Sequence, residues 1–270
     1  MLLVTGASGH LGSLIHAGLV GRGRSPLAGT RDPARFGATG RAMDFDDPAG
    51  PDLSGVRVLV LVSAGYGEDD VVIARHDRVI AAAERYGVEH VVYTSLVGAG
   101  DHLAFALAHR WTERRLRGSA LGWTILRNGL YAELFGQLAA PVDGAVTAPF
   151  GTGGLAAVAR QDLADAAVRV AEDPNAHRNR VYELTGPVAL TAAGLAAALG
   201  VPYRPVPLGE HRRALAGLDL LPFQPAMLMS IHSATAAGFL AGRHADLAGL
   251  LGRPPRDAMP VAVAAARLSS

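Results

Sequence analysis

Residues 5–12 read TGASGHLG, and this stretch is the strongest indication of the fold. A short apolar run precedes it, and residues 10–22 carry apolar side chains at helical spacing. Gly6 lets the chain turn sharply, Gly9 lets a ligand approach the backbone, and Gly12 lets a helix pack against a sheet. The free N–H groups and the dipole at the start of such a helix favour a phosphate. The stretch therefore predicts a strand, a turn and a helix that bind a dinucleotide, rather than a tight turn in an unrelated fold.

The rest of the first half alternates short apolar runs with helical stretches. Residues 56–62 read VRVLVLV and apart from Arg57 are valine and leucine, which is typical of a parallel strand covered on both faces. Strands that alternate with helices predict βαβ units with right-handed crossovers. We therefore expect an α/β fold with a doubly wound parallel Rossmann sheet. The further strands are expected at 26–30, 41–43, 88–95 and 123–126, and the helices at 71–86 and 102–117.

The second half is less regular and predicts a smaller C-terminal substrate-binding lobe. Residues 142–154 are rich in Gly and Pro and indicate a loop or lid. Helices are expected at 162–172 and 191–199, in two later stretches, and from about Met259 onward. The predicted division is a dinucleotide-binding core of 1–128 plus 161–185, a substrate lobe of 129–160 plus 186–256, and a C-terminal helix and tail of 257–270.

The composition excludes several classes of function. The chain has 270 residues, and its 25 basic and 24 acidic side chains leave a net charge of +1, so we expect neither nucleic acid nor a membrane surface as a partner. All the basic residues are arginine, which excludes Schiff-base chemistry and a P-loop lysine. The absence of cysteine excludes thiolate catalysis and Cys-based metal sites. His232 and His244 lack metal-ligand spacing, so we predict no metal.

Hydropathy predicts a cytoplasmic protein. No segment approaches the roughly 18 consecutive apolar residues that a membrane-spanning helix needs. The first residues run into the glycine turn without a basic stretch, so we expect no signal peptide.

The spacing Gly-x-x-Gly-x-x-Gly resembles that of the short-chain dehydrogenase/reductase superfamily. The sequence is similar to the atypical branch that contains NmrA-like proteins, QorB-type NAD(P)H:quinone oxidoreductases and triphenylmethane reductase. This resemblance covers nearly the whole chain, and it implies an NAD(P)H-dependent oxidoreductase. The segments that carry it beyond the glycine turn are Asp44, 58–64, 93–96, 123–129, 182–186 and 250–255.

The end of the second predicted strand favours NADP(H). An NAD enzyme places an acidic residue there, whereas this chain places Arg31 and Arg35, whose guanidinium groups suit a 2′-phosphate. Asp32 keeps NAD(H) as an alternative, and a solvated surface role is the alternative for the arginines. The resemblance implies that Asp44 lies beside the adenine, although it can equally be a turn residue. The full set of expected coenzyme contacts is Gly6, Ser8, Gly9, His10, Leu11, Gly12, Arg31, Arg35, Asp44, Phe45, Ser63, Ala64, Gly65 and Thr94.

The catalytic Tyr-x-x-x-Lys pair of the superfamily is missing, because the chain has no lysine. Aligning residues 112–116 with the family helix puts His109 at the lysine position and Phe105 at the tyrosine position. Ser95 remains where the family has Ser or Thr. Reducing an isolated ketone needs a placed proton donor, typically worth ~10²–10⁴-fold in rate. A conjugated acceptor spreads the incoming charge and depends mainly on positioning. The sequence therefore favours conjugated acceptors, or no chemistry at all.

Three residues are candidates for catalysis, namely His109, His102 and Ser95. A histidine titrates near neutral pH and can relay a proton, but solvated positions on a helix or a loop are the alternatives for both histidines. The candidates for contact with substrate are Asn128, Tyr131 and Phe223, with core packing as the alternative for the two rings.

We therefore predict an NADPH-dependent oxidoreductase that transfers a hydride to a quinone-like or other conjugated aromatic acceptor. One alternative is a non-catalytic NmrA-like regulator that senses NAD(P). Another is a carbonyl reductase or a tailoring enzyme of secondary metabolism in which a histidine donates the proton. Either a monomer or a homodimer is expected.

Overall fold

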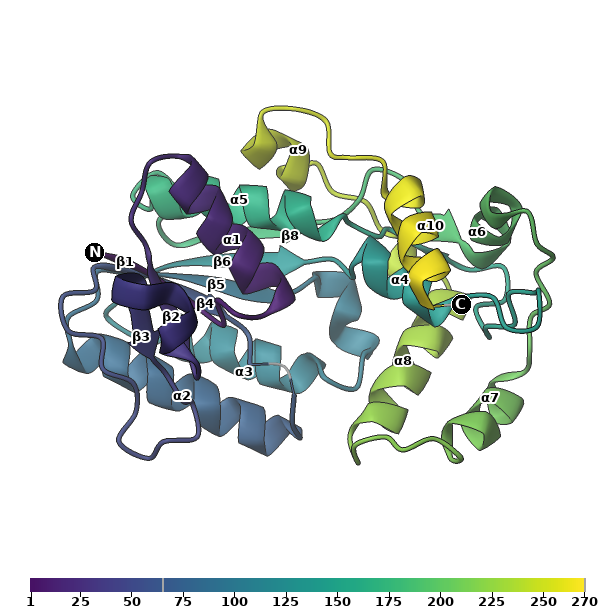
Figure 1. Cartoon of the computed structure of the whole chain (residues 1–270), viewed down its shortest axis with the longest axis horizontal. Helices are drawn as coiled ribbons and strands as arrows, with labels where there is room; N and C mark the ends of the chain where they lie inside the picture. The colour runs from purple at the N-terminus through teal and green to yellow at the C-terminus, as the bar shows by residue number, and fades with distance from the viewer. Residues whose placement is uncertain (65, 270) are drawn as a thin grey trace.

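A seven-stranded parallel sheet forms the centre of the computed structural model, which describes residues 1–64 and 66–269 (Figure 1). The strand order is β3-β2-β1-β4-β5-β6-β8, so the order reverses between β1 and β4. This reversal opens a crevice at the carboxyl ends of those two strands, where doubly wound folds bind ligands. The strands are β1 Leu2–Thr5, β2 Leu27–Thr30, β3 Gly40–Ala42, β4 Val58–Val62, β5 His90–Leu96, β6 Gly122–Asn128 and β8 Arg180–Leu184.

Helices cover both faces of this sheet, as the predicted βαβ units require. One face packs against α1 His10–Gly21, α5 Arg160–Glu172 and α9 Asp246–Leu251 through a core that includes Val4, Val60 and Val92. The other face packs against α2 Asp69–Arg85 and α3 Ala106–Arg117 through a second core that includes Leu59 and Tyr93. The uniformly apolar strand β4 is thus buried from both sides.

The remaining elements build a smaller lobe beside the carboxyl edge of the sheet (Figure 1). Its core joins Phe135, Phe150, Leu195 and Ile231. Helices α4 and α10 touch so closely that a Cβ on Gly136 would lie 2.1 Å from the carbonyl oxygen of Ala262. The elements of the lobe are α4 Ala132–Leu138, β7 Gly154–Leu155, β9 Leu190–Thr191, α6 Ala192–Leu199, α7 Leu208–Leu215, α8 Gln224–Ala236, η3 Phe239–Ala241 and α10 Ala258–Ser269.

Two helix predictions differ from the structure. A helix was expected from residue 102, but Gly98–His102 forms a separate 3₁₀ turn, η2, and α3 begins only at Ala106. Two helical stretches were expected between 208 and 251, whereas the structure has three, α7, α8 and α9. Helix α6 is as predicted, because Thr191 Oγ1 accepts a hydrogen bond from the N–H of Gly194 and Gly200 ends the helix at φ +74°.

Two further properties concern membranes and metals. Among residues 1–64 and 66–269, no helix is both long and apolar enough to cross a membrane. The same residues bring no three His, Asp or Glu side chains together in a way that could hold a metal ion.

Candidate coenzyme and substrate site

The glycine turn joins β1 to α1 at the sheet reversal. Gly6 has φ +59°, and a Cβ on Gly12 would lie 2.1 Å from the Gly6 carbonyl oxygen, so only glycine fits there. Gly9 precedes α1, which has no side-chain cap and no acidic residue in its first turn. His10 is exposed at the start of this helix, and Leu11 is buried beneath it. This cradle leaves the positive end of the helix dipole open to a phosphate, so the turn fits a dinucleotide.

A polar link fixes the turn relative to the end of β2. The Thr30 hydroxyl donates to Ser8 Oγ at 3.1 Å and accepts from the Asp32 N–H at 3.2 Å. Arg31 and Arg35 are exposed, and neither guanidinium forms a hydrogen bond or an ion pair within the described chain. Arg31 interacts electrostatically with Asp46 but makes no hydrogen bond to it, so both guanidinium groups are available to bind the 2′-phosphate of NADP(H).

Hydrogen bonds from Arg75 on α2 fix the segment that follows β3. Nε and Nη2 of Arg75 donate to the two carboxylate oxygens of Asp46 at 2.7 and 2.6 Å, and Nη1 donates to the Tyr66 carbonyl at 2.7 Å. Asp44 Oδ1 accepts from the Asp46 N–H at 3.0 Å, so Asp44 does act as a turn residue. It is exposed and Phe45 is half-buried, which leaves both available to a nucleotide base.

The segment after β4 flanks the other side of the crevice. The N–H of Ser63 donates to Thr94 Oγ1 at 3.1 Å, and the N–H of Ala64 donates to His76 Nε2 at 3.0 Å. These bonds tie the expected coenzyme contacts Ser63, Ala64 and Thr94 together. Gly65, another expected contact, lies outside the described residues.

His76 is a buried support that the sequence analysis missed. Because Nε2 accepts from an amide, the ring carries its proton on Nδ1 and donates it to Thr112 Oγ1 at 2.8 Å. Burial lowers the pKa of His76 to about 3, so the ring is neutral. Its spacing from Val72 and Val79 puts it on the apolar face of α2, and a histidine at such a position was the signal available in the sequence.

His109 lies at hydrogen-bond distance from Tyr93, a residue of the central sheet. The ring is half-buried in the first turn of α3, and its Nδ1 lies 2.9 Å from the hydroxyl of Tyr93, which is fully buried on β5. Burial, with a smaller contribution from Arg110, lowers the pKa of His109 to about 4. Burial also raises the pKa of Tyr93. At neutral pH both groups are therefore uncharged.

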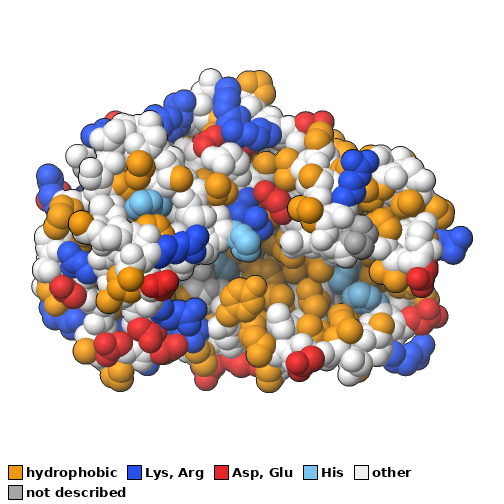
Figure 2. Space-filling view, in the orientation of Figure 1, with side chains coloured by type: hydrophobic (Ala, Val, Ile, Leu, Met, Phe, Trp, Pro, Cys, Tyr) orange, Lys and Arg blue, Asp and Glu red, His pale blue; other side chains and the backbone are white. Residues whose placement is uncertain are grey.

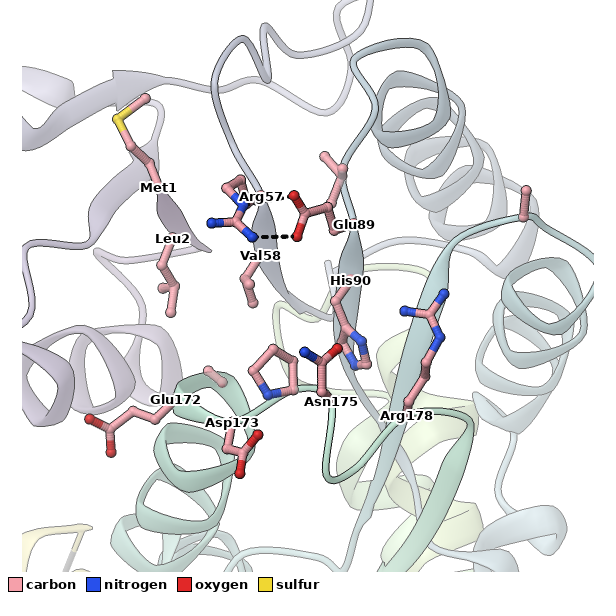
Figure 3. A pocket seen from close by; sticks show the side chains of 14 residues that line it. Met1, Leu2, Arg57, Val58, Glu89, His90, Glu172, Asp173, Asn175 and Arg178 are labelled. Atoms are coloured by element: carbon pink, nitrogen blue, oxygen red, sulfur yellow. Dashed lines mark hydrogen bonds and ion pairs between the residues drawn. The ribbon is translucent and has the colours of Figure 1, made fainter.

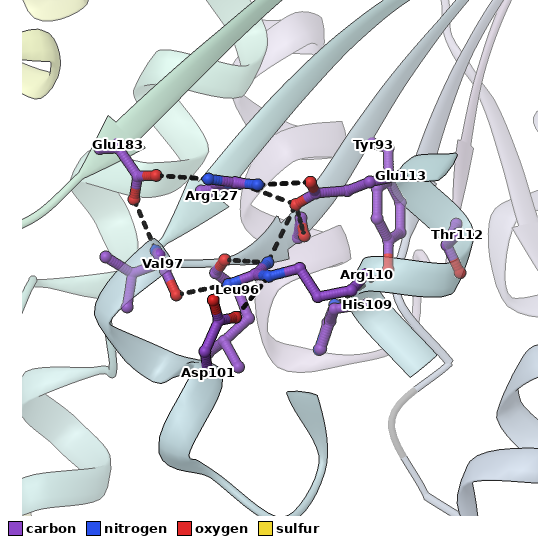
Figure 4. A network of polar contacts seen from close by, with 12 residues as sticks. Tyr93, Leu96, Val97, Asp101, His109, Arg110, Thr112, Glu113, Arg127 and Glu183 are labelled. Carbon is purple, nitrogen blue, oxygen red and sulfur yellow. Dashed lines mark hydrogen bonds and ion pairs between the residues drawn. The ribbon is translucent and has the colours of Figure 1, made fainter. Parts of the chain in front are cut away.

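An ionic network surrounds the buried Glu113 (Figure 4), and Ser95 belongs to it. Its hydroxyl donates to Glu113 Oε1 at 2.7 Å, and Arg127 donates to both oxygens of Glu113 at 2.8 and 2.7 Å. Arg127 also pairs with Glu183 at 2.8 Å, which accepts the Gly98 N–H at 2.7 Å. The Ser95 hydroxyl thus has a carboxylate partner, and the network fixes the start of the loop after β5.

Glu113 remains ionised at the centre of this network. Burial raises the pKa of its carboxyl, but hydrogen bonds from Arg127 and Ser95 and the nearby positive charges outweigh burial and leave it lowered. Arg110 adds a bond to Glu113 at 3.0 Å and also donates to Asp101 at 2.6 Å, inside η2. The network therefore connects β5, α3, β6 and β8 around the candidate site.

His102 contacts the smaller lobe. Its exposed ring stacks on Phe239 with centroids 4.0 Å apart and planes at 18°. Close by, the N–H of Ala104 donates to Ser230 Oγ on α8 at 3.0 Å. The loop after β5 thus docks on the lobe, and His102 contributes to that contact.

The predicted substrate residues lie at the boundary between the sheet and the lobe. Asn128 ends β6 and is buried, and its Oδ1 has no hydrogen-bond partner in the described part of the chain. Tyr131 lies under the Arg160 guanidinium at 4.6 Å, which agrees with its packing alternative. Phe223 meets the exposed Tyr66 edge-on at 6.2 Å, so a ring from the core and a ring from the lobe touch. Figure 2, in the orientation of Figure 1, shows hydrophobic side chains lining a hollow in the middle of the face in view.

A separate cavity of about 660 Å³ opens at the amino ends of the strands, opposite the glycine turn (Figure 3). Met1, His90 and Arg178 line it, and Arg57 on its rim pairs with Glu89 at 2.7 Å. Doubly wound folds bind their ligands at the carboxyl ends of the strands. The candidate coenzyme site is at the carboxyl ends of the strands, where the glycine turn, Arg31 and Arg35 lie.

Comparison with known proteins agrees with this geometry. Residues 6–174 match the family model described as NAD(P)H-binding. The chain is 33% identical to quinone oxidoreductase 2 of Escherichia coli K12 over 94% of each chain. It is 27% identical to the NAD(P)H azoreductase of Xenophilus azovorans over 95% of this chain and 94% of that protein.

Solved structures of a quinone oxidoreductase and a triphenylmethane reductase superpose on the whole chain. The E. coli NADPH-dependent quinone oxidoreductase QOR2 complexed with NADPH covers 100% of both chains, with a TM-score of 0.85 and 30% identity. The Citrobacter sp. triphenylmethane reductase complexed with NADP(H) gives a TM-score of 0.85 and 25% identity, over 100% of this chain and 99% of that one.

Proposed function

The chain belongs to the NAD(P)H-binding family, and from this premise we propose that it is an NADPH-dependent reductase of quinone-like or other conjugated aromatic acceptors. One observation carries the choice of acceptor. The chain contains no lysine at all, and His109, which we align with the superfamily's lysine, is neutral. Such a centre suits acceptors that delocalise the charge they receive.

The residues around the sheet reversal hold the coenzyme, which supplies a hydride when bound. The glycine turn and the start of α1 bind its phosphates, and Arg31 and Arg35 bind the 2′-phosphate that distinguishes NADP(H) from NAD(H). Asp44 and Phe45 flank the base, with Arg75 holding their segment in place.

The acceptor lies between the sheet and the smaller lobe. Phe223 and Tyr66 stack on or enclose an aromatic ring, and the apolar hollow excludes water from it. Asn128 offers a buried amide whose oxygen has no partner in the described chain, so it can accept a hydrogen bond from the acceptor or the coenzyme. Tyr131, beneath Arg160, contributes to the wall.

Of the three predicted catalytic residues, we favour His109. Ser95 donates its proton to Glu113, and His102 stacks on Phe239 at the surface of the lobe. His109 is half-buried and neutral, so it donates a hydrogen bond and is a weak acid. The proton that completes the reduction of a quinone then comes from solvent.

A coenzyme oxidation assay tests this function. Purified protein is mixed with NADPH or NADH and one of four acceptors, namely a naphthoquinone, an azo dye, a triphenylmethane dye or an unconjugated ketone. We expect loss of the reduced-nicotinamide absorbance with NADPH and the conjugated acceptors. Tight NADPH binding without turnover of any acceptor would instead support a regulator that senses the coenzyme. Rapid turnover of the ketone would support a carbonyl reductase.

The expected cytoplasmic location and the choice between a monomer and a homodimer are further predictions. Cell fractionation and light scattering test them.

A further inference from the structure

Tyr93 and His109 form a hydrogen-bonded pair between the central sheet and α3. Tyr93 projects from the middle of β5 toward the layer of α2 and α3, and no part of its side chain reaches solvent. Its hydroxyl lies 2.9 Å from His109 Nδ1. A phenol sealed in this way needs a hydrogen-bond partner, and the imidazole supplies one.

The surrounding groups favour one direction for this bond. Thr112 donates its proton to the Ala108 carbonyl at 2.7 Å and accepts from His76. Ser63 and Thr112 lie near the Tyr93 oxygen, where their hydroxyl groups oppose the effect of burial on its pKa. The nitrogen lone pair of an imidazole is a stronger acceptor than a hydroxyl oxygen, and His109 Nδ1 lies at hydrogen-bond distance. The Tyr93 hydroxyl is therefore expected to donate to Nδ1.

This direction fixes the proton of His109. A neutral imidazole carries one N–H, so an accepting Nδ1 leaves the proton on Nε2. Nε2 forms no hydrogen bond within the described chain, and it is not among the described polar atoms that are sealed without a partner. The ring is half-buried, so Nε2 is the atom it offers to solvent or to a ligand.

We infer that Tyr93 is a positioning residue that holds His109 as the neutral Nε2–H tautomer. His109 then presents a fixed hydrogen-bond donor to the coenzyme and the acceptor, rather than a mobile proton. This inference rests on the proposed function for its use of Nε2, whereas the tautomer itself is a property of the free protein.

The charged and titratable groups around His109 agree with a neutral ring. Arg110 from its own helix disfavours the imidazolium, and Glu113 from the next turn favours it. His76 faces the same region from α2 and is itself neutral. Burial dominates these effects and keeps the pKa of His109 low.

The chain contains a matched control. Tyr182 on β8 places its hydroxyl 2.8 Å from His177 Nδ1, in a second pair of the same chemistry. Tyr93→Phe and Tyr182→Phe each remove one phenol from one histidine. Only the first changes a histidine of the candidate site.

Nitrogen NMR of the coenzyme-free protein, labelled with ¹⁵N-histidine, tests the tautomer directly. We expect the wild-type His109 to show a protonated Nε2 and an unprotonated Nδ1. In Tyr93→Phe we expect a mixture of the two tautomers and a higher pKa of His109, because the lost bond stabilised the neutral ring. An Nδ1–H tautomer in the wild-type protein, or an unchanged His109 in Tyr93→Phe, would overturn the inference. The wild-type spectrum decides the first point even when the variant folds poorly.

Kinetics then test what the fixed donor does. We expect Tyr93→Phe to lower kcat about three- to tenfold while the KM for NADPH changes little, as for loss of an oriented donor. Tyr182→Phe is expected to leave both constants unchanged. His109→Gln, which keeps an N–H donor, should retain more activity than His109→Leu. Equal losses in those two variants would refute the donor role. A protein with the predicted tautomer and no turnover would refute the proposed function alone.

Discussion

The central sheet has an amino edge, where its strands begin, and a carboxyl edge, where they end. The two edges differ in their chemistry in a way that cavity volume does not reveal. The amino edge opens into a cavity of about 660 Å³, yet Arg57 on its rim is neutralised by Glu89. The carboxyl edge has the glycine turn, a neutral His109, and two arginines, Arg31 and Arg35, whose guanidinium groups form no hydrogen bond or ion pair with the described residues. Unpaired donors and a backbone shaped for close approach identify a ligand site better than volume does.

A substitution in the glycine turn should have the largest effect on coenzyme binding. A Cβ on Gly12 would lie 2.1 Å from the Gly6 carbonyl oxygen, so Gly12→Ala must push α1 away from the turn. We expect NADPH affinity to fall by about 100-fold or more and unfolding stability by about 1–3 kcal/mol. Calorimetric titration and urea denaturation measure the two effects.

The control for this variant lies in the same helix. Gly21 ends α1, and a Cβ there meets nothing within 4 Å. Gly21→Ala should leave NADPH binding unchanged. Equal binding losses in both variants would show that α1 matters only for folding.

Removing the charge of Glu113 should weaken the support of the carboxyl edge. Glu113 is 3% exposed and faces Arg110 and Arg127, so Glu113→Gln leaves two guanidinium groups undercompensated. We expect a loss of about 3 kcal/mol in stability and a higher KM for the acceptor, because the loop after β5 loosens. Urea denaturation at neutral pH measures the stability, with Glu89→Gln at the exposed amino-edge pair as the control.

Because Glu113 is ionised in the folded protein, the stability of the protein should depend on pH. The folded-state pKa of Glu113 is lowered, so its stabilisation is fully present above the unfolded pKa and is lost as the pH falls through the folded value. The wild-type protein should therefore lose more stability on acidification than Glu113→Gln does. Parallel acid dependence in both proteins would argue against an ionised Glu113.

Replacing Arg31 should affect NADPH and NADH differently. Arg31→Ala removes an unpaired guanidinium at the end of β2 and should lower kcat/KM for NADPH about 10–100-fold, with little change for NADH. Arg57→Ala removes a paired guanidinium at the amino edge and should change neither value. Equal losses with both coenzymes would place Arg31 away from the 2′-phosphate.

The smallest effect concerns pH and activity. Because the pKa of His109 is lowered to about 4, its neutral form prevails at all higher pH values and is lost only as the pH falls through about 4. For a triphenylmethane dye, kcat/KM should therefore be nearly constant between about pH 6 and pH 8. A steep change in that range, absent in His109→Gln, would show that His109 titrates during turnover.

The sequence predicts the nucleotide half well because its signals are local. The apolar run of β4 and the glycines of residues 6–12 determine their own conformations. The early helix expected from residue 102 fails for the opposite reason. Leu103 is extended at φ −89° and ψ 141°, so the helix breaks there, and Arg110 binds the Leu96 and Val97 carbonyls just before η2.

The supports of the candidate site could not be predicted from local patterns. His76, Tyr93 and Glu113 lie on three different elements, and each acquires its partner only when the sheet and the helices pack. Their one signal is a polar group on an apolar face, as with His76 on α2. That signal shows that a partner is needed, but it does not identify the partner.

Hydride transfer to a conjugated acceptor without a strong acid is tested most directly with a deuterated coenzyme. NADPH carrying deuterium at the transferred position of the nicotinamide is incubated with the protein and a cationic triphenylmethane dye, and the reduced dye is analysed by mass spectrometry. We predict a product that retains one deuterium on its central carbon, because the hydride alone completes this reduction. Unlabelled product, or no reduction by protein that binds NADPH, would contradict the account.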